Sequence, residues 1–221
     1  MISAQNTSLT YFDHGRKIHA CEDVSLEVKD GEFLGILGPS GSGKSSLLYL
    51  LSGLKNPTSG EVIYEGKSLH GRSDEERANL RLKDFGFVFQ YPYLIGYLSA
   101  LENVLVGTPG KEKDEDAKNL LSDLGLSEHL HRLPHELSGG QRQRVCVARA
   151  LLGGRKAIFA DEPTAALDHE AGMQVMRLLV KHRGEGALVM VTHDPSMLEG
   201  ADRIVKINDG RLVDEQLLTH S

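Results

Sequence analysis

The sequence predicts an α/β protein built on a mainly parallel sheet, with a small N-terminal antiparallel β-subdomain and an inserted α-helical subdomain. Three observations predict this fold. Short, continuous apolar runs alternate with longer helical patterns, which is typical of a parallel sheet covered by helices. One apolar run leads into a Gly-rich stretch that opens a helix. Between residues 91 and 137 a polar, helix-like region without a strong strand interrupts the alternation.

The apolar runs give the strands of the core. Phe33–Leu37 is followed by the Gly-rich stretch and by a helix that begins near Lys44 and closes at Gly53. Three further runs have the continuous apolar character of strands buried on both faces: Phe85–Phe89, Ala157–Ala160 and Leu188–Val191.

The remaining elements flank this core. RIVKINDGRLV predicts a hairpin with Asp209 and Gly210 in its turn. The segment up to Val28 and Glu61–Tyr64 show shorter alternating patterns that suit a small antiparallel sheet. We expect a single domain over 1–221, with 1–90 and 138–221 as core and 91–137 as a helical insertion. Its charge run KEKDEDAKN is interpreted as a solvated helix face.

Length, composition and charge exclude several classes of protein. The 221 residues fit one domain, and 40% hydrophobic with 25% charged residues is an ordinary globular composition. The formal net charge of −6 disfavours sequence-independent nucleic-acid binding, which needs clustered cations. Cys21 and Cys146 lie far apart, so they indicate neither a disulfide framework nor a thiolate metal site.

The sequence shows no targeting or membrane-spanning pattern. The first residues, MISAQNTSL, lack the basic and apolar regions of a signal peptide. No apolar run approaches the length of about 18 residues that spans a bilayer. We therefore expect a protein that is soluble when expressed alone.

The stretch GPSGSGKS fits the phosphate-binding pattern G-x-x-x-x-G-K-[ST] and stands between a predicted strand and a predicted helix. Its glycines let backbone N–H groups converge on phosphate oxygens, and the helix adds its positive end. We expect Lys44 to reach the β- and γ-phosphates and Ser45 to join a Mg²⁺ shell. The predicted nucleotide contacts are Gly38, Pro39, Ser40, Gly41, Ser42, Gly43, Lys44, Ser45 and Ser46.

Polar side chains at other strand ends support a P-loop NTPase core. Asp161 and Glu162 follow a predicted strand, where α/β proteins bind ligands. We expect Asp161 to hold Mg²⁺ and Glu162 to polarise an attacking water. Alone, such a pair would be an N-cap or a surface pair, but beside a P-loop the functional interpretation is preferred. His193 and Gln90 also end predicted strands, and His193 is expected to contact the γ-phosphate.

A second anion-binding helix start follows the insertion. Ser138 is a good N-cap, and Gly139 and Gly140 expose backbone N–H groups before Gln141. The resulting LSGGQ resembles the signature of the ABC-transporter ATPases, and the motif set covers nearly the whole chain. The resemblance implies a head-to-tail dimer in which each ATP lies between the P-loop of one copy and the signature of the other.

The resemblance implies roles for further residues. Tyr11 is similar to the aromatic residue that stacks on adenine, although it could be a strand aromatic, and Phe12 is its nearest competitor. Gln90 resembles the Q-loop glutamine near the metal, so the implied Mg²⁺ ligands are Ser45, Gln90 and Asp161. Glu162 resembles the general base and His193 the switch histidine. Ala166-Leu167-Asp168 resembles the D-loop that crosses the dimer. The insertion at 91–137 resembles the subdomain that docks on a membrane partner.

Several stretches narrow the resemblance within the family. The chain is similar to the lipoprotein-releasing and macrolide-efflux ATPases in the stretches LRLKDFGFVFQ, LSALENV and FADEPTAALD. The cell-division ATPase FtsE is a close relative of this group. The chain departs from the usual pattern of the family at Cys146, at Ala165 and at residues 153–156. None of these positions is a predicted phosphate contact.

The resemblance implies a Mg²⁺-dependent ATPase subunit, bound peripherally at the cytoplasmic face of the inner membrane. It would power a separate permease in export or extraction. The alternative is FtsE-like mechanical signalling through a membrane partner. A soluble ABC ATPase acting on DNA or ribosomes is disfavoured, because the sequence carries no coiled coil, zinc module or second ATPase unit.

Overall fold

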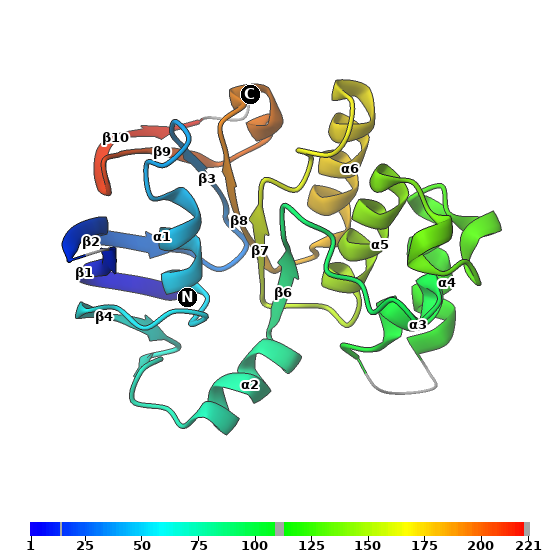
Figure 1. Ribbon diagram of the computed structural model, residues 1–221, viewed down its shortest axis with the longest axis horizontal. Coiled ribbons are helices and arrows are strands. Elements are labelled where there is room, and N and C mark those ends of the chain that lie inside the picture. The colour runs from blue at the N-terminus through cyan, green and yellow to red at the C-terminus, as the bar shows by residue number, and fades with distance from the viewer. Residues whose placement is uncertain (14, 109–112, 219–221) are drawn as a thin grey trace. The chain divides into compact units, whose positions relative to one another are not determined.

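The computed structural model describes residues 1–13, 15–108 and 113–218. By its internal contacts the chain divides into two compact units. The first comprises Met1–Arg81 and Val189–Ser221, and the second comprises Leu82–Leu188. Figure 1 labels most of the helices and strands of both units.

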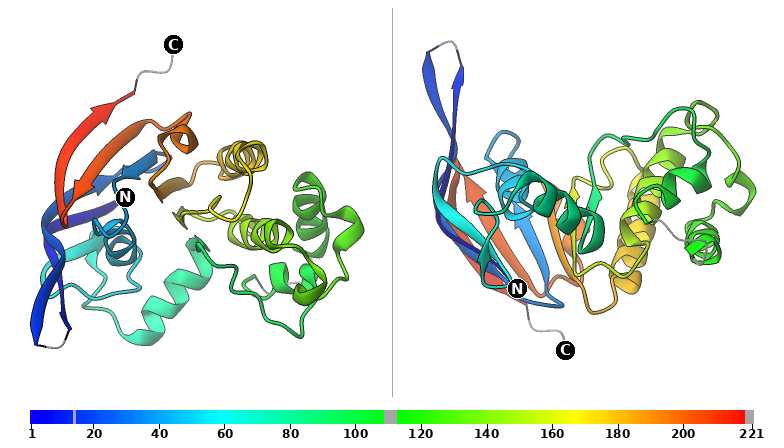
Figure 2. Two further views of the ribbon diagram at one scale, coloured as in Figure 1. Left: turned by 45° about the horizontal axis from the view of Figure 1, so that its top comes forward. Right: turned by 90° about the horizontal axis from the view of Figure 1, so that it is seen from below.

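The first unit contains a four-stranded antiparallel sheet in the order β2-β1-β4-β5. Its strands are β1 (Ile2–Asp13), β2 (Arg16–Val28), β4 (Ser59–Tyr64) and β5 (Lys67–Ser68). The prediction of a small antiparallel sheet from these two segments is confirmed. β4 pairs with β1 only as far as Ser8, so the outer half of β1 pairs with β2 alone. Figure 2 shows this two-stranded ribbon extending beyond β4.

The second sheet is mixed and mostly parallel, with the strand order β10-β9-β3-β8-β7-β6. Its strands are β3 (Phe33–Leu37), β6 (Phe85–Val88), β7 (Ala157–Asp161), β8 (Ala187–Thr192), β9 (Arg203–Asn208) and β10 (Arg211–Leu217). β3 runs parallel to β9, and β6 runs parallel to β7. Every residue of β7 and β8 is buried, which is why these strands read as continuous apolar runs.

The hairpin of β9 and β10 confirms the turn expected from its sequence. Asp209 and Gly210 have φ angles of 46° and 76°, so both lie in the left-handed region that a two-residue hairpin turn requires. Asp–Gly is suited to these positions because glycine carries no Cβ and aspartate tolerates this conformation.

The helices of the second unit gather around α5 (Gly139–Leu151). This helix contacts β6, α3 (Ala100–Leu105), α4 (Lys113–Asp123) and α6 (His169–His182). Two short 3-10 turns, η1 (Ser127–His129) and η2 (Pro134–Glu136), lie between α4 and α5 in sequence. Within the described part of 91–137 no strand occurs, as the sequence predicts.

The charge run of the insertion forms most of α4. Lys111 and Glu112 lie outside the described residues, and the rest of the run is helical. Only Ala117 and Leu121 of α4 are buried, so its charged side chains form a solvated face, as expected. Lys118 pairs with Asp114 at 2.6 Å along this face.

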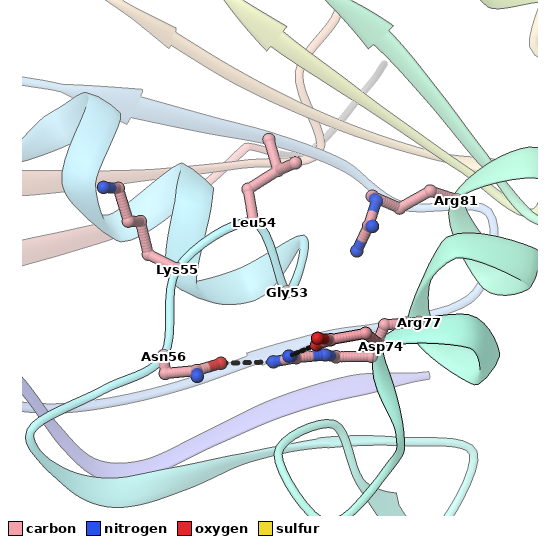
Figure 3. A pocket seen from close by; sticks show the side chains of 7 residues that line it. All are labelled: Gly53, Leu54, Lys55, Asn56, Asp74, Arg77 and Arg81. Atoms are coloured by element: carbon pink, nitrogen blue, oxygen red, sulfur yellow. Dashed lines mark hydrogen bonds and ion pairs between the residues drawn. The ribbon is translucent and has the colours of Figure 1, made fainter.

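The sequence analysis did not predict helix α2 (Asp74–Lys83). It buries none of its residues, so it lacks the apolar periodicity that identifies a packed helix. The helix starts where the Ser73 hydroxyl accepts from the Glu76 N–H and the Glu76 carboxylate accepts from the Ser73 N–H. Figure 3 shows the pocket that this helix lines with the loop after α1, where Arg77 reaches both Asn56 and Asp74.

Helix α1 (Lys44–Leu51) begins and ends where the sequence predicts, with Gly53 at a φ of 66° just beyond its C-cap. It contacts β1 and β2, and its four leucines, Leu47, Leu48, Leu50 and Leu51, are buried. A short turn, η3 (Pro195–Leu198), follows β8. No helix among the described residues has both the length and the apolar content needed to cross a bilayer.

Candidate functional site

The Gly-rich stretch joins the buried strand β3 to helix α1, as its sequence pattern requires. Two contacts with neighbouring segments hold this loop in place. The Gly210 N–H donates to the Ser42 carbonyl at 2.9 Å, and the buried Cys21 Sγ lies 3.8 Å from the Gly43 carbonyl oxygen. The loop is therefore fastened to both β2 and the β9–β10 turn. Burial raises the pKa of the Cys21 thiol to about 12, so this side chain is an uncharged packing group.

Two glycines of the loop have no room for a side chain. A Cβ on Gly38 would lie 2.3 Å from the Ile207 carbonyl oxygen and 2.6 Å from Ser42 Oγ. A Cβ on Gly43 would lie 2.1 Å from the Ala20 carbonyl oxygen, and Gly43 has a φ of 102°. Both positions therefore require glycine for the backbone to curl tightly into α1.

We expect Gly43→Ala to lower the free energy of unfolding by about 3 kcal/mol, because it combines a steric clash with backbone strain. The matched control is Gly41→Ala. Gly41 has a φ of 79° but no atom within 4 Å of its Cβ position, so only strain of about 1 kcal/mol is expected. Urea unfolding of both variants measures the difference. Equal losses would mean that the close approach to Ala20 is unimportant.

The loop presents groups that fit a phosphate chain. Lys44 is 7% exposed, and its Nζ donates to the carbonyl oxygens of Gly38 and Pro39, both at 2.8 Å. An ammonium group has three donors, so one remains for a bound oxygen. Ser42 Oγ is buried without a hydrogen-bond partner in the described structure. A buried cation, an orphaned hydroxyl and a helix N-terminus together suit an anion.

Two further predicted residues lie in the first unit. His193 directly follows β8 and is exposed. The turn after it is fixed, since the Asp194 carboxylate accepts from the Ser196 N–H at 2.9 Å. Tyr11 lies in β1 and is 38% exposed, and Lys55 Nζ lies 6.0 Å from its ring centroid. Phe12, its competitor, is 76% exposed.

The acidic pair lies in the second unit. Asp161 ends β7 and is 4% exposed, and Glu162 follows with a φ of 46°. A left-handed glutamate is uncommon and costs backbone strain, and such strain occurs both in tight turns and at active sites. Gln90 follows β6 and is exposed. The preceding Phe89 carbonyl is held by the Gln143 side chain of α5 at 2.9 Å.

The signature segment forms the start of α5, as the sequence predicts. Ser138 is the N-cap, and its hydroxyl accepts from the Gln141 N–H at 3.2 Å. The Gln141 side-chain oxygen accepts from the Ser138 N–H at 2.8 Å, which completes a capping box. A Cβ on Gly140 would lie 2.9 Å from Leu167 Cδ2, so the D-loop segment packs closely on the signature.

Asp168 has a structural function that the sequence analysis did not identify. Its carboxylate accepts from the Ala171 N–H at 2.9 Å, so it is the N-cap of α6. The structure thus places the predicted residues in two sets. The first unit holds Tyr11, the loop 38–46 and His193, and the second holds Gln90, Ser138–Gln141, Asp161, Glu162 and Asp168.

Comparison with known proteins identifies the family. A family model described as "ABC transporter" matches residues 21–165. The "Putative hemin import ATP-binding protein HrtA" of Staphylococcus epidermidis is 43% identical over 215 residues, covering 94% of this chain and 96% of that protein. The "Lipoprotein-releasing system ATP-binding protein LolD" of Aquifex aeolicus is 48% identical over 198 residues, covering 87% and 88%.

A solved structure of the same fold is also similar in sequence. It is described as a dimeric post-hydrolysis state of the ATP-binding cassette MJ0796 bound to ADP and Pi. It matches with a TM-score of 0.93 and 36% identity, and the match covers both chains completely. With these similarities and the loop geometry described above, the chain belongs to the ABC transporter family as an ATP-binding cassette.

Proposed function

We propose that the chain binds ATP with Mg²⁺ at the loop 38–46 and hydrolyses it to drive a separate membrane permease. The observation that carries this proposal is the buried Lys44 ammonium within a glycine loop at a helix start, beside the orphaned Ser42 hydroxyl. The triphosphate would receive the third Lys44 proton and the N–H groups of the loop. Tyr11 would stack on the adenine.

Mg²⁺ would be held by oxygen atoms of Ser45, Gln90 and Asp161. Hydroxyl, amide and carboxylate oxygens are the ligands this hard cation prefers, and Asp161 is a buried carboxylate at a strand end. When bound, Mg²⁺ neutralises charge on the phosphates. The residues of this set fit the metal by their chemistry.

Glu162 would act as the general base that takes a proton from the attacking water. Its left-handed backbone directly after Asp161 sets the direction in which its side chain leaves the strand end. His193 would donate a hydrogen bond to the γ-phosphate, and Gln90 would help to orient the water.

We further propose that two copies share each ATP. The nucleotide bound to the loop of one copy would contact the signature segment of the other copy, Ser138, Gly139, Gly140 and Gln141. Asp168, in the D-loop, would cross the dimer interface. The start of α5 suits this role because the backbone N–H groups of its first turn point along the helix axis, where they can donate to an anion. The similarity to a dimeric cassette supports the proposal.

The partner would be a permease that docks on the insertion 91–137, with the cassette at the cytoplasmic face of the inner membrane. We propose an export or extraction function of the lipoprotein-releasing or macrolide-efflux type. The similarity to LolD supports it. The sequence identity to HrtA, whose description contains hemin import, is comparable to that to LolD. Sequence identity therefore does not fix the direction of transport, and we propose that the permease decides it.

Purification of tagged Glu162→Gln protein from solubilised membranes in the presence of ATP tests this proposal. We expect a four-span permease with a large external domain to co-purify, as identified by mass spectrometry. A many-span importer-type permease would overturn the export direction. A partner that acts on cell-wall hydrolases would favour the FtsE-like alternative, and ribosomes or DNA without a permease would refute transport.

A further inference from the structure

The signature segment is bonded to a histidine that the proposed ATPase mechanism does not use. Gln141 Nε2 and His129 Nε2 are 3.0 Å apart, and both residues lie in the second unit. His129 ends η1, twelve residues before Gln141. This contact therefore joins the start of α5 to a separate turn of the insertion.

The capping box fixes which atom of the Gln141 amide faces the histidine. The Ser138 backbone N–H can only donate, so the atom 2.8 Å from it is the Gln141 carbonyl oxygen. The NH₂ group of Gln141 consequently faces His129 and donates. His129 Nε2 must then accept, which makes the imidazole neutral with its proton on Nδ1.

The segment that carries His129 is itself fixed to the insertion. The His129 N–H donates to the Leu126 carbonyl at 2.9 Å, and the Leu101 N–H of α3 donates to the Leu130 carbonyl at 2.9 Å. The Ala100 N–H donates to the Arg132 carbonyl at 2.8 Å. Backbone hydrogen bonds to Leu126 and from α3 therefore hold the segment that carries His129.

The proton assigned to Nδ1 meets no acceptor among the described residues. His129 Nδ1 is buried without a hydrogen-bond partner in the described structure. The charged or titratable groups on its own segment, on η2, on α3, on α5 and at the end of α4 are Glu128, His131, Arg132, His135, Glu136, Glu102, Arg142, Arg144, Cys146, Arg149 and Asp123. Among the described residues, none of these forms an ion pair or hydrogen bond with His129; Asp123, for example, pairs with His182 at 2.9 Å.

We propose that neutral His129 is a positioning residue that holds Gln141, and with it the signature segment, in the orientation needed for the shared ATP site. This inference rests on the proposed function of the signature. A proton on Nε2 would set an N–H against the Gln141 NH₂. The amide cannot turn over to relieve this, because its NH₂ would then face the Ser138 N–H.

Variants of His129 in a Glu162→Gln background test the proposal through ATP-induced dimerisation. His129→Gln supplies an amide oxygen as the acceptor, so its dimer should match the parent dimer. His129→Leu lacks an acceptor, so its dimer should be about fivefold weaker. His131→Gln is the control, because His131 is exposed on the same segment.

An unaffected His129→Leu dimer, or a His129→Gln dimer as weak as that of His129→Leu, would overturn the proposal. Imidazole ¹⁵N NMR of the nucleotide-free wild-type chain gives a test that does not depend on dimerisation. We expect the Nδ1–H tautomer for His129, and an Nε2–H tautomer would also overturn the proposal. A parent that shows this tautomer but does not dimerise with ATP would refute the shared-site function instead.

Discussion

Glu162→Gln is expected to abolish ATP hydrolysis while ATP binding remains and the protein accumulates as a stable dimer. The amide keeps the size of the glutamate side chain but cannot accept the proton of the attacking water, so turnover should fall by about 10²- to 10⁴-fold. The phosphate loop lies on other residues, 38–46, and its contacts are unchanged. Because the nucleotide is not consumed, the two copies would stay closed around it.

Light scattering during size-exclusion chromatography, with ATP and Mg²⁺ at saturation, measures this dimer, and phosphate release measures turnover. The matched control is Glu185→Gln, which removes an exposed carboxylate from the same unit. We expect this control to hydrolyse ATP at the wild-type rate. A Glu162→Gln variant that stayed monomeric would contradict the shared-site model, and one that kept wild-type turnover would exclude Glu162 as the base.

Lys44→Ala is expected to weaken ATP binding by about 10- to 100-fold. A charge-assisted hydrogen bond from a buried ammonium contributes more than a neutral one, and no other cation lies within the loop 38–46. The substitution also removes the two hydrogen bonds from Nζ to the loop carbonyls, so the loop itself loses support. Lys44→Met retains the aliphatic stem and separates the loss of charge from the loss of packing.

Isothermal titration calorimetry with ATP and Mg²⁺ measures both variants, and thermal unfolding confirms that they fold. Lys29→Ala, at an exposed position in the same unit, is the control and should bind ATP as the wild type does. Affinity within twofold of wild type for Lys44→Met would contradict the assigned contact with the phosphates.

Most of the core was predictable because its signals are local. A fully buried strand such as β7 needs an unbroken apolar run, and the Asp209–Gly210 turn needs two residues that tolerate positive φ. The glycine spacing of the phosphate loop is equally local, since Gly38 and Gly43 have no room for a Cβ. Each of these requirements is met by neighbouring residues and is therefore visible in the sequence.

The sequence alone also indicated the family and the residues of the candidate site, through the phosphate loop, the acidic pair and the signature. It did not reveal α2, because a helix that buries no residue has no apolar face to leave a pattern. It did not reveal that Asp168 caps α6, because aspartate also occurs in turns and as a metal ligand.

Contacts between distant residues were decided only by the tertiary structure. The approach of Ala20 to Gly43, the packing of Leu167 on Gly140 and the bond between Gln141 and His129 join segments that carry no shared pattern. These contacts depend on how the strands and helices pack, and small displacements of those elements would remove the contacts. The sequence determined which groups are present and on which local elements they lie, while packing determined which of these groups meet.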